Sequence, residues 1–169
     1  MNELSENKVY QSLRTVVAAV AGISLINVFL IKMEIERNLL FSAFLPVWGA
    51  NYGIYFAPEV NRNRIIAGGV LLIGVFYICY LLAGKRPGWM MFAALLYLID
   101  TWIMIWFIET RGYSYTSWGL DIVSHIIVLV LMVRAGVIGR NRIKKKPAEV
   151  ISEPVEEKPE NKVDYYVDD

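Results

Sequence analysis

Apolar positions along the chain gather into long runs, and polar positions gather between them. Four of these runs are long enough for one helical crossing each, at 13–31, 65–83, 89–108 and 118–138. About 20 apolar residues in a helix span the hydrocarbon core of a bilayer. The pattern therefore predicts an all-α polytopic membrane protein with four transmembrane helices, which together form one domain over 13–138.

Polar segments flank this domain on both sides. Residues 1–12 are predicted to be a short cytoplasmic lead, and 139–169, rich in Pro, Glu and Lys, a disordered cytoplasmic tail. A cleaved signal peptide is the alternative interpretation of the first apolar run. Its small residues Ala18, Ala19 and Ala21 lie inside the run rather than after it, which favours an uncleaved anchor.

A further apolar segment, 38–56, is not predicted to cross the membrane. Helix-disfavouring or polar residues fall in its middle, namely Pro46, Gly49, Asn51 and Gly53. Its aromatic residues recur at steps of three and four and form a stripe on one helical face: Phe41, Phe44, Trp48, Tyr52 and Tyr55. Since Tyr and Trp prefer the headgroup level, we expect a broken interfacial or re-entrant segment between the first and second crossings.

The basic residues near the predicted membrane ends set the orientation. With four crossings and an internal N-terminus, ten lie inside: Lys8, Arg14, Lys85, Arg86, Arg134, Arg140, Arg142, Lys144, Lys145 and Lys146. Five lie outside: Lys32, Arg37, Arg62, Arg64 and Arg111. This excess follows the positive-inside rule. It places the C-terminus in the cytoplasm.

Five crossings with an external N-terminus score the same, because Lys8 and Arg14 then exchange places with Lys32 and Arg37. The interrupted middle of 38–56 decides for four crossings. We therefore predict a multi-pass protein of the plasma membrane with both termini cytoplasmic.

Composition narrows the function classes. Hydrophobic residues make up 56% of the chain and charged residues 20%, and the net charge of +1 gives no reason to expect nucleic acid as a partner. The chain has one cysteine, Cys79, and one histidine, His125. These counts exclude an intramolecular disulfide and give no ligand set for zinc, so no metal and no cofactor are expected.

Ionisable residues inside membrane helices are costly, and each is a functional candidate. Asp100 falls near the middle of its run, on a helical face that excludes Trp102 and Trp106. Asp121 and His125 are four residues apart, so they share one face of the last helix. The third and fourth crossings are antiparallel neighbours, and Asp100 and His125 fall at similar depths. The sequence therefore predicts a hydrogen-bonded Asp100–His125 pair, either direct or through one water.

Two uncharged polar residues on the first crossing, Ser24 and Asn27, fall in the same outer half and could complete an intramembrane polar cluster. The same helix carries small residues, Ala18 and Gly22, suited to close helix packing. The two sets lie on nearly opposite faces. The sequence does not decide which face meets the bundle.

Three functions remain open for this cluster. The first is a structural or interaction subunit in the plasma membrane, with a membrane-protein partner or a second copy of the chain. The second is a small transporter or a proton- or cation-handling protein that uses Asp100 and His125. A water-accessible cavity reaching Asp100 would favour the second over the first.

An intramembrane enzyme is the third function. Ser124 directly precedes His125 and points about 100° away from it on a helix, and no glycine pattern of a nucleophile elbow surrounds Ser24 or Ser124. We therefore expect no catalytic residue, and we favour the first function.

A basic cluster follows the last crossing directly and consists of Arg140, Arg142, Lys144, Lys145 and Lys146. Clusters at this place attract anionic lipid headgroups and strengthen orientation. The lipid bilayer is therefore the partner predicted for it, and a docking site for a soluble protein is the alternative.

Several short motifs resemble those of small four-helix membrane proteins of bacteria that have no established activity. They are Ser24-Leu25-Ile26-Asn27, Phe41-Ser42-Ala43-Phe44-Leu45-Pro46, Leu98-Ile99-Asp100-Thr101 and Asp121-Ile122-Val123-Ser124-His125. The resemblance covers roughly residues 12–140 and implies only a bacterial plasma-membrane setting. Small multidrug transporters also have four helices, but they place a carboxylate in the first helix, and the first run here has none.

Overall fold

A computed structural model describes residues 3–35 and 39–152, with side chains described for 5–35 and 39–141. The described part is helical and contains no strand. The helices are α1 (Glu3–Lys32), α2 (Phe44–Tyr55), α3 (Glu59–Ala83), α4 (Gly88–Arg111) and α5 (Gly119–Ser152).

Four of the described helices are long and apolar enough to cross a membrane. The apolar stretches are Ser5–Lys32, Glu59–Ala83, Gly88–Arg111 and Gly119–Asn141. The first three contain their predicted runs, and the fourth begins one residue after the start of 118–138. The chain is thus an all-α protein compatible with a multi-pass membrane protein. The remaining helix, α2, has 12 residues and is about 18 Å long at 1.5 Å per residue. That length is below the roughly 30 Å of the hydrocarbon core.

Two helices extend beyond the ranges that their apolar runs predict. α1 begins at Glu3, so most of the predicted lead 1–12 belongs to the first turns of this helix. Tyr10 is buried there and donates a hydrogen bond of 2.8 Å to the carbonyl of Ala83, which ties these turns to the end of α3. α5 continues to Ser152, into the segment predicted to be disordered. The rest of that segment, 153–169, lies outside the described residues.

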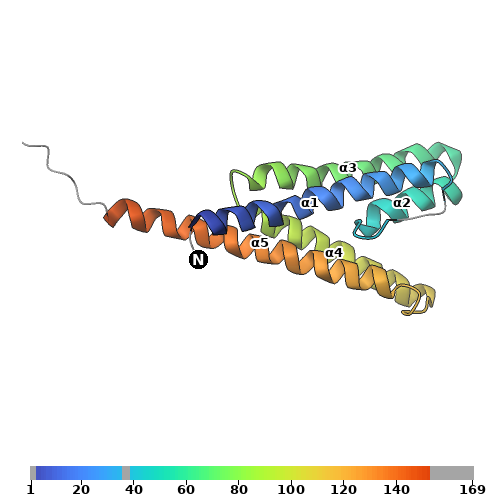
Figure 1. The fold of residues 1–169 in the computed structure, drawn as a ribbon. Coiled ribbons are helices and arrows are strands. Elements are labelled where there is room, and N and C mark those ends of the chain that lie inside the picture. The colour runs from blue at the N-terminus through green and yellow to red at the C-terminus, as the bar shows by residue number, and fades with distance from the viewer. Residues whose placement is uncertain (1–2, 36–38, 153–169) are drawn as a thin grey trace, which may run out of the picture.

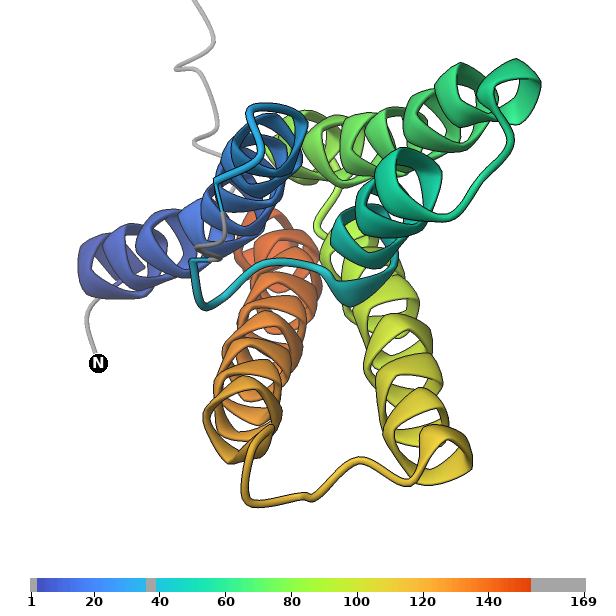
Figure 2. The same ribbon diagram turned by 90° about the vertical axis from the view of Figure 1, so that its right-hand side faces the viewer.

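The helices form an elongated bundle in which α4 and α5 make a hairpin (Figure 1). The start of α1, the turn between α3 and α4, and the far part of α5 lie at one end. The link from α1 to α2, the turn from α2 to α3, and the loop from α4 to α5 lie at the other end. In the end-on view, α2 lies between α3 and α4, and the α4–α5 hairpin spreads away below it (Figure 2).

α2 runs unbroken from Phe44 to Tyr55, although its sequence predicted a broken segment. Pro46 falls in the first turn, where a missing N–H costs little. The glycines serve close packing rather than a break. A Cβ added at Gly53 would lie 3.2 Å from Ile66 on α3, and one added at Gly69 on α3 would lie 3.1 Å from the carbonyl oxygen of Pro46. Small residues therefore let α2 and α3 approach closely.

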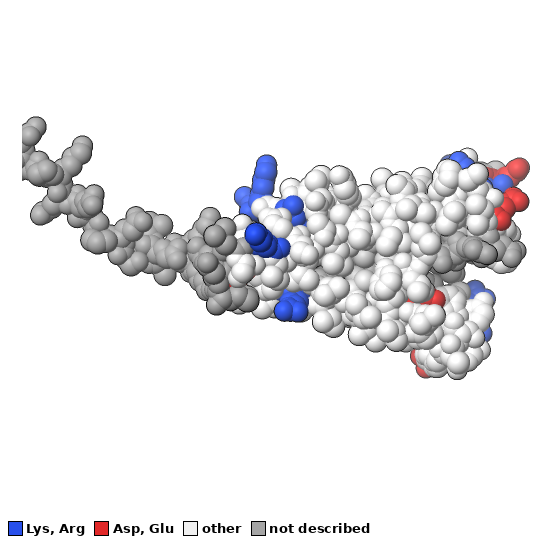
Figure 3. Space-filling view, viewed as in Figure 1, with Lys and Arg blue, Asp and Glu red and all other residues white. Residues whose placement is uncertain are grey.

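On the visible surface, charged side chains gather at the two ends of the bundle. In Figure 3 the end with the α3–α4 turn shows only Lys and Arg on the visible face, whereas the opposite end shows both signs. Between them the surface is apolar, with Trp102 71% and Trp106 59% exposed on α4. Those two side chains point outward as their helical positions predicted.

Candidate functional site

The most buried acidic side chain of the site, Asp100 on α4, binds the start of α2. It is 2% exposed. Its Oδ2 accepts a hydrogen bond of 2.7 Å from the backbone N–H of Phe44, and its Oδ1 accepts one of 2.8 Å from the N–H of Leu45. Both carboxylate oxygens are therefore used on one helix terminus.

α2 needs such an acceptor because its own sequence supplies none. The residue before the helix is Ala43, which has no side chain to cap it, and the first turn contains no acidic residue. The first N–H groups of a helix have no partner within the helix and carry the positive end of its dipole. A carboxylate from a neighbouring helix satisfies both requirements. Asp100 is thus the N-cap that α2 lacks locally.

Two residues of α1 fix the link that leads into α2. Ser24 donates to the carbonyl of Val20 at 2.7 Å and accepts from the N–H of Ala43 at 2.8 Å. Asn27 makes two bonds to Leu39, donating to its carbonyl at 2.8 Å and accepting from its N–H at 2.7 Å. Ser24 is 1% and Asn27 0% exposed. The face of α1 that meets the bundle is therefore the one that carries Ser24 and Asn27.

The small-residue face of α1 points away from the bundle at Gly22. This glycine is exposed, and a Cβ added there would meet nothing within 4 Å. The open choice between the two faces of α1 is thereby resolved.

His125 lies beside this carboxylate without a hydrogen bond to it. Its Nδ1 is 2.8 Å from the carbonyl oxygen of Asp121, which can only accept, so Nδ1 carries the proton. Its Nε2 is buried without a hydrogen-bond partner and lies 3.6 Å from Oδ2 of Asp100. The imidazole ring stacks on Tyr97, with 5.2 Å between centroids and 17° between planes.

The structure therefore brings Asp100 and His125 together, and the distance between them is longer than a direct hydrogen bond. Because Nδ1 already holds one proton, Nε2 faces the carboxylate as a bare nitrogen in the neutral ring. It faces the carboxylate as an N–H only in the imidazolium.

A cavity of about 330 Å³ reaches His125 from between α2, α4 and α5. Its polar lining includes Asp121, His125, Asn51, Ser42 and Ser117, and its apolar lining includes Phe44, Trp48, Met104 and Trp118. Asp121 is half-buried at its edge. Asp100 is not part of the lining, because the first turn of α2 covers both of its oxygens.

The serines near the histidine bind main-chain groups. Ser124 donates to the carbonyl of Asp121 at 2.8 Å, and Ser24 donates to Val20 on its own helix. Since Nε2 of His125 has no hydrogen-bond partner, neither hydroxyl is paired with a base in the described part of the chain. Within the same part, no three His, Cys, Asp or Glu side chains come together in a way that could hold a metal ion.

Within the predicted basic cluster, the structure describes the side chain of Arg140 alone. Arg140 is exposed near the end of the apolar part of α5. Arg142, Lys144, Lys145 and Lys146 lie in helical backbone, and their side chains are outside the described residues.

Three of the predicted polar residues, Ser24, Asn27 and Asp100, bind main-chain groups between Leu39 and Leu45, which the sequence did not indicate as partners. Reasoning from helical faces paired Asp100 with His125 and overlooked the amides of Phe44 and Leu45. A signal was present in the sequence. A helix whose capping position is an alanine, rather than Ser, Thr, Asp or Asn, needs an acceptor from elsewhere.

Comparison of the chain with protein-family models, with curated proteins and with solved structures finds no match.

Proposed function

We propose that the chain is an integral protein of the plasma membrane that crosses it four times, with both termini in the cytoplasm, and that it serves as a structural or interaction subunit of a membrane complex. Four apolar helices support the membrane setting. The end that holds the α3–α4 turn shows only Lys and Arg on the visible face in Figure 3, as a cytoplasmic end would. In this topology α2 enters from the outer side without crossing.

The use of the buried polar side chains carries the functional part of the proposal. Asp100 and Asn27 make their hydrogen bonds to main-chain groups between Leu39 and Leu45, and Ser24 accepts one from the same segment. A carboxylate that transports protons or cations must change partners in each cycle, and here that change would uncap α2. These side chains therefore have a structural role, and we expect the protein to function through the outer surface of the bundle that they hold together.

Two measurements test this proposal. In liposomes, the purified chain should give no flux of protons, Na⁺ or K⁺ above that of empty vesicles. When it is extracted from its own membranes in mild detergent, it should migrate on a native gel well above the single chain of 19.3 kDa in the same detergent micelle. A chain that migrates as a monomer and supports a flux would contradict the proposal.

A second candidate, a proton- or cation-handling protein, is favoured by one observation at His125. The histidine is 3% exposed, its Nε2 has no hydrogen-bond partner, and it borders a cavity that Asp121 also lines. Histidine changes its charge near physiological pH. A proton that enters the cavity would reach the imidazole of His125 before it reached Asp100, which does not line the cavity.

The substitution His125→Gln separates the two candidates. Glutamine keeps hydrogen-bonding capacity but does not exchange protons near neutral pH. The subunit proposal expects this variant to keep its level in the membrane and its native-gel mass, because Nε2 makes no bond in the structure. Proton handling instead expects a folded protein whose flux is lost. The matched control is Ser117→Ala. Ser117 lines the same cavity but, unlike His125, has no group that titrates near neutral pH.

A further inference from the structure

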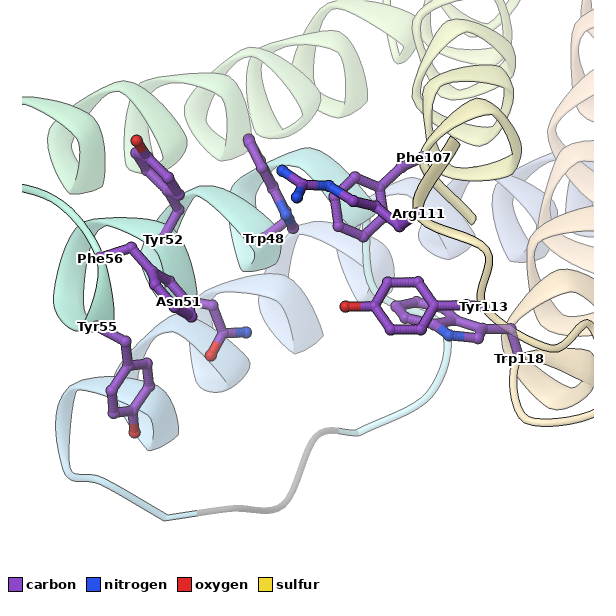
Figure 4. A pocket seen from close by; sticks show the side chains of 9 residues that line it. All are labelled: Trp48, Asn51, Tyr52, Tyr55, Phe56, Phe107, Arg111, Tyr113 and Trp118. Atoms are coloured by element: carbon purple, nitrogen blue, oxygen red, sulfur yellow. The ribbon is translucent and has the colours of Figure 1, made fainter. Parts of the chain in front are cut away.

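A second cavity, of about 370 Å³, lies at the outer end of the bundle between α2 and the α4–α5 loop. Its volume falls in the range of small-molecule sites. Nine residues line it: Trp48, Asn51, Tyr52, Tyr55, Phe56, Phe107, Arg111, Tyr113 and Trp118 (Figure 4). Seven of these nine are aromatic, and Arg111 is the one residue of the lining with a charge.

The aromatic wall formed by α2 and the residue that follows it is a continuous stack of rings. The centroids of Trp48 and Tyr52 are 5.5 Å apart with 20° between planes, and those of Tyr52 and Phe56 are 6.2 Å apart with 24°. The opposite wall comes from α4 and the loop after it, where Tyr113 lies 5.9 Å from Phe107 and 6.0 Å from Trp118. The two walls meet at Trp48 and Phe107, whose centroids are 5.5 Å apart, and enclose the cavity between this contact and the loop.

Arg111 is the last residue of α4, and its guanidinium points across the cavity toward Trp48 (Figure 4). Its Cζ lies 5.7 Å from the centre of the Phe107 ring, a cation–π contact that orients the group. Among the described residues, no carboxylate lies within ion-pair distance of it, and the cavity lining contains none. The guanidinium is therefore an oriented cation that faces the cavity without a counter-ion.

We propose that this cavity binds the phosphate headgroup of an anionic phospholipid from the outer leaflet. A guanidinium fork matches the geometry of a phosphate. The rings give the glycerol and the first carbons of the acyl chains an apolar wall, and Asn51 adds an amide for headgroup hydroxyls. A zwitterionic headgroup fits less well, because its ammonium has the same charge as Arg111 and finds rings but no carboxylate in the lining.

The position of the cavity along the helices supports a lipid as the occupant. Arg111 ends the apolar stretch Gly88–Arg111, and the cavity lies beside it, where tyrosine and tryptophan meet the headgroups in membrane proteins. The inference rests on the proposed membrane topology, which cysteine labelling tests separately in the same reconstituted sample. Failure of the topology and failure of the lipid site would therefore be told apart.

Tryptophan quenching by brominated lipids tests the site. Trp89, Trp102 and Trp106 are replaced by Phe, which leaves Trp48 and Trp118 in the cavity as reporters. The protein is then placed in bilayers that contain brominated phosphatidylglycerol or brominated phosphatidylcholine. We expect half-quenching at roughly fivefold less phosphatidylglycerol than phosphatidylcholine, the preference that one basic residue at a membrane surface gives.

Arg111→Gln should reduce this ratio to about one while unfolding temperature in detergent stays unchanged. The matched control is Arg64→Gln, an exposed arginine near the start of α3 that does not line the cavity. Native mass spectrometry should also find one phosphatidylglycerol retained by the parent and by Arg64→Gln, and none by Arg111→Gln.

Three outcomes would overturn the proposal. The first is equal quenching by the two lipids in the parent protein. The second is an equal loss in Arg64→Gln, which would indicate a general surface effect. The third is displacement of the lipid by inorganic phosphate at low millimolar concentration, which would make the site one for a free anion. A loss of the folded state in Arg111→Gln is checked by Arg111→Lys, which should keep part of the preference as a point charge.

Discussion

The carboxylate of Asp100 lies 2.7 Å from the backbone N–H of Phe44, although 56 positions separate the two residues in the chain. With the adjacent bond to Leu45, this contact makes a side chain of α4 the cap of α2. A carboxylate at a helix N-terminus interacts with the dipole as well as with the amides. The usual cost of a buried acid in a membrane protein is thereby offset by a backbone that would otherwise be unsatisfied.

Replacing Asp100 tests the cap. Asp100→Asn keeps one oxygen as an acceptor and replaces the other with an NH₂ group, which can only donate. One N–H of α2 therefore loses its partner. We expect a loss of about 1–3 kcal/mol in the free energy of unfolding, the cost of one buried unsatisfied group, and a larger loss for Asp100→Ala. Reversible unfolding in mixed detergent micelles measures both.

The control for this substitution is Glu109→Gln, the same exchange at an exposed position of α4. It should stay within about 0.5 kcal/mol of the parent. The cap would be disproved if Asp100→Asn and Glu109→Gln were equally stable.

The link into α2 should loosen when its anchors on α1 change. Asn27→Asp keeps the acceptor for the N–H of Leu39 but places an oxygen against the carbonyl of Leu39, where a donor was. Hydrogen exchange of the amides of Leu39 and Ala43 should accelerate about 5–30-fold, which corresponds to one or two kcal/mol. Ser12→Ala, at an exposed position of the same helix, should leave these rates unchanged. Unchanged rates in Asn27→Asp would show that this side chain does not hold the link.

Two adjacent glycines of α3 should respond in opposite ways to alanine. At Gly69 the added Cβ would lie 3.1 Å from the carbonyl oxygen and 3.3 Å from the Cα of Pro46, both rigid main-chain atoms. At Gly68 it would meet nothing within 4 Å. Gly69→Ala should cost about 1–3 kcal/mol through overpacking, whereas Gly68→Ala should be neutral or should stabilise by up to about 1 kcal/mol. Equal effects in unfolding experiments would mean that α2 does not pack against α3 in this way.

Cysteine labelling tests the proposed topology. In a background without Cys79, a cysteine at Ser114 or at Asn61 should react with an impermeant reagent from outside. A cysteine at Lys145 should react only after the membrane is opened. The positions belong to the α4–α5 loop, the start of α3 and the far part of α5. Protection of Asn61 together with Lys145 would instead indicate five crossings.

The number of long helices and the faces of α4 followed from the sequence because both depend on local periodicity. Asp100 points inward and Trp102 outward as the 3.6-residue repeat requires. The extension of α1 to Glu3 did not follow. Its polar first turns are helical where Tyr10 reaches Ala83 across the bundle, a contact that no local pattern records.

The partner of Asp100 also escaped prediction, for a related reason. Helical wheels compare side chains with side chains, and the groups that bind Asp100 are backbone amides at the start of another helix. The glycines of α2 were misread in the same way. Gly53 suggested a break, but its missing side chain makes room for Ile66. Such roles are decided by tertiary packing, which overrides propensity.

The separation of the anchors along the chain sets an order for assembly during synthesis. Ser24 and Asn27 lie only 19 and 12 positions from the main-chain groups they bind, so the link can attach to α1 as soon as it leaves the ribosome. The carboxylate that caps α2 arrives 56 positions after Phe44, once α3 has been made and α4 has followed it. Until then the first amides of α2 must keep water or headgroups as partners. The short helix thus gains its cap only after α3 and the first half of α4 have been made, and its last ring contact, from Phe44 to Trp118, waits for the start of α5.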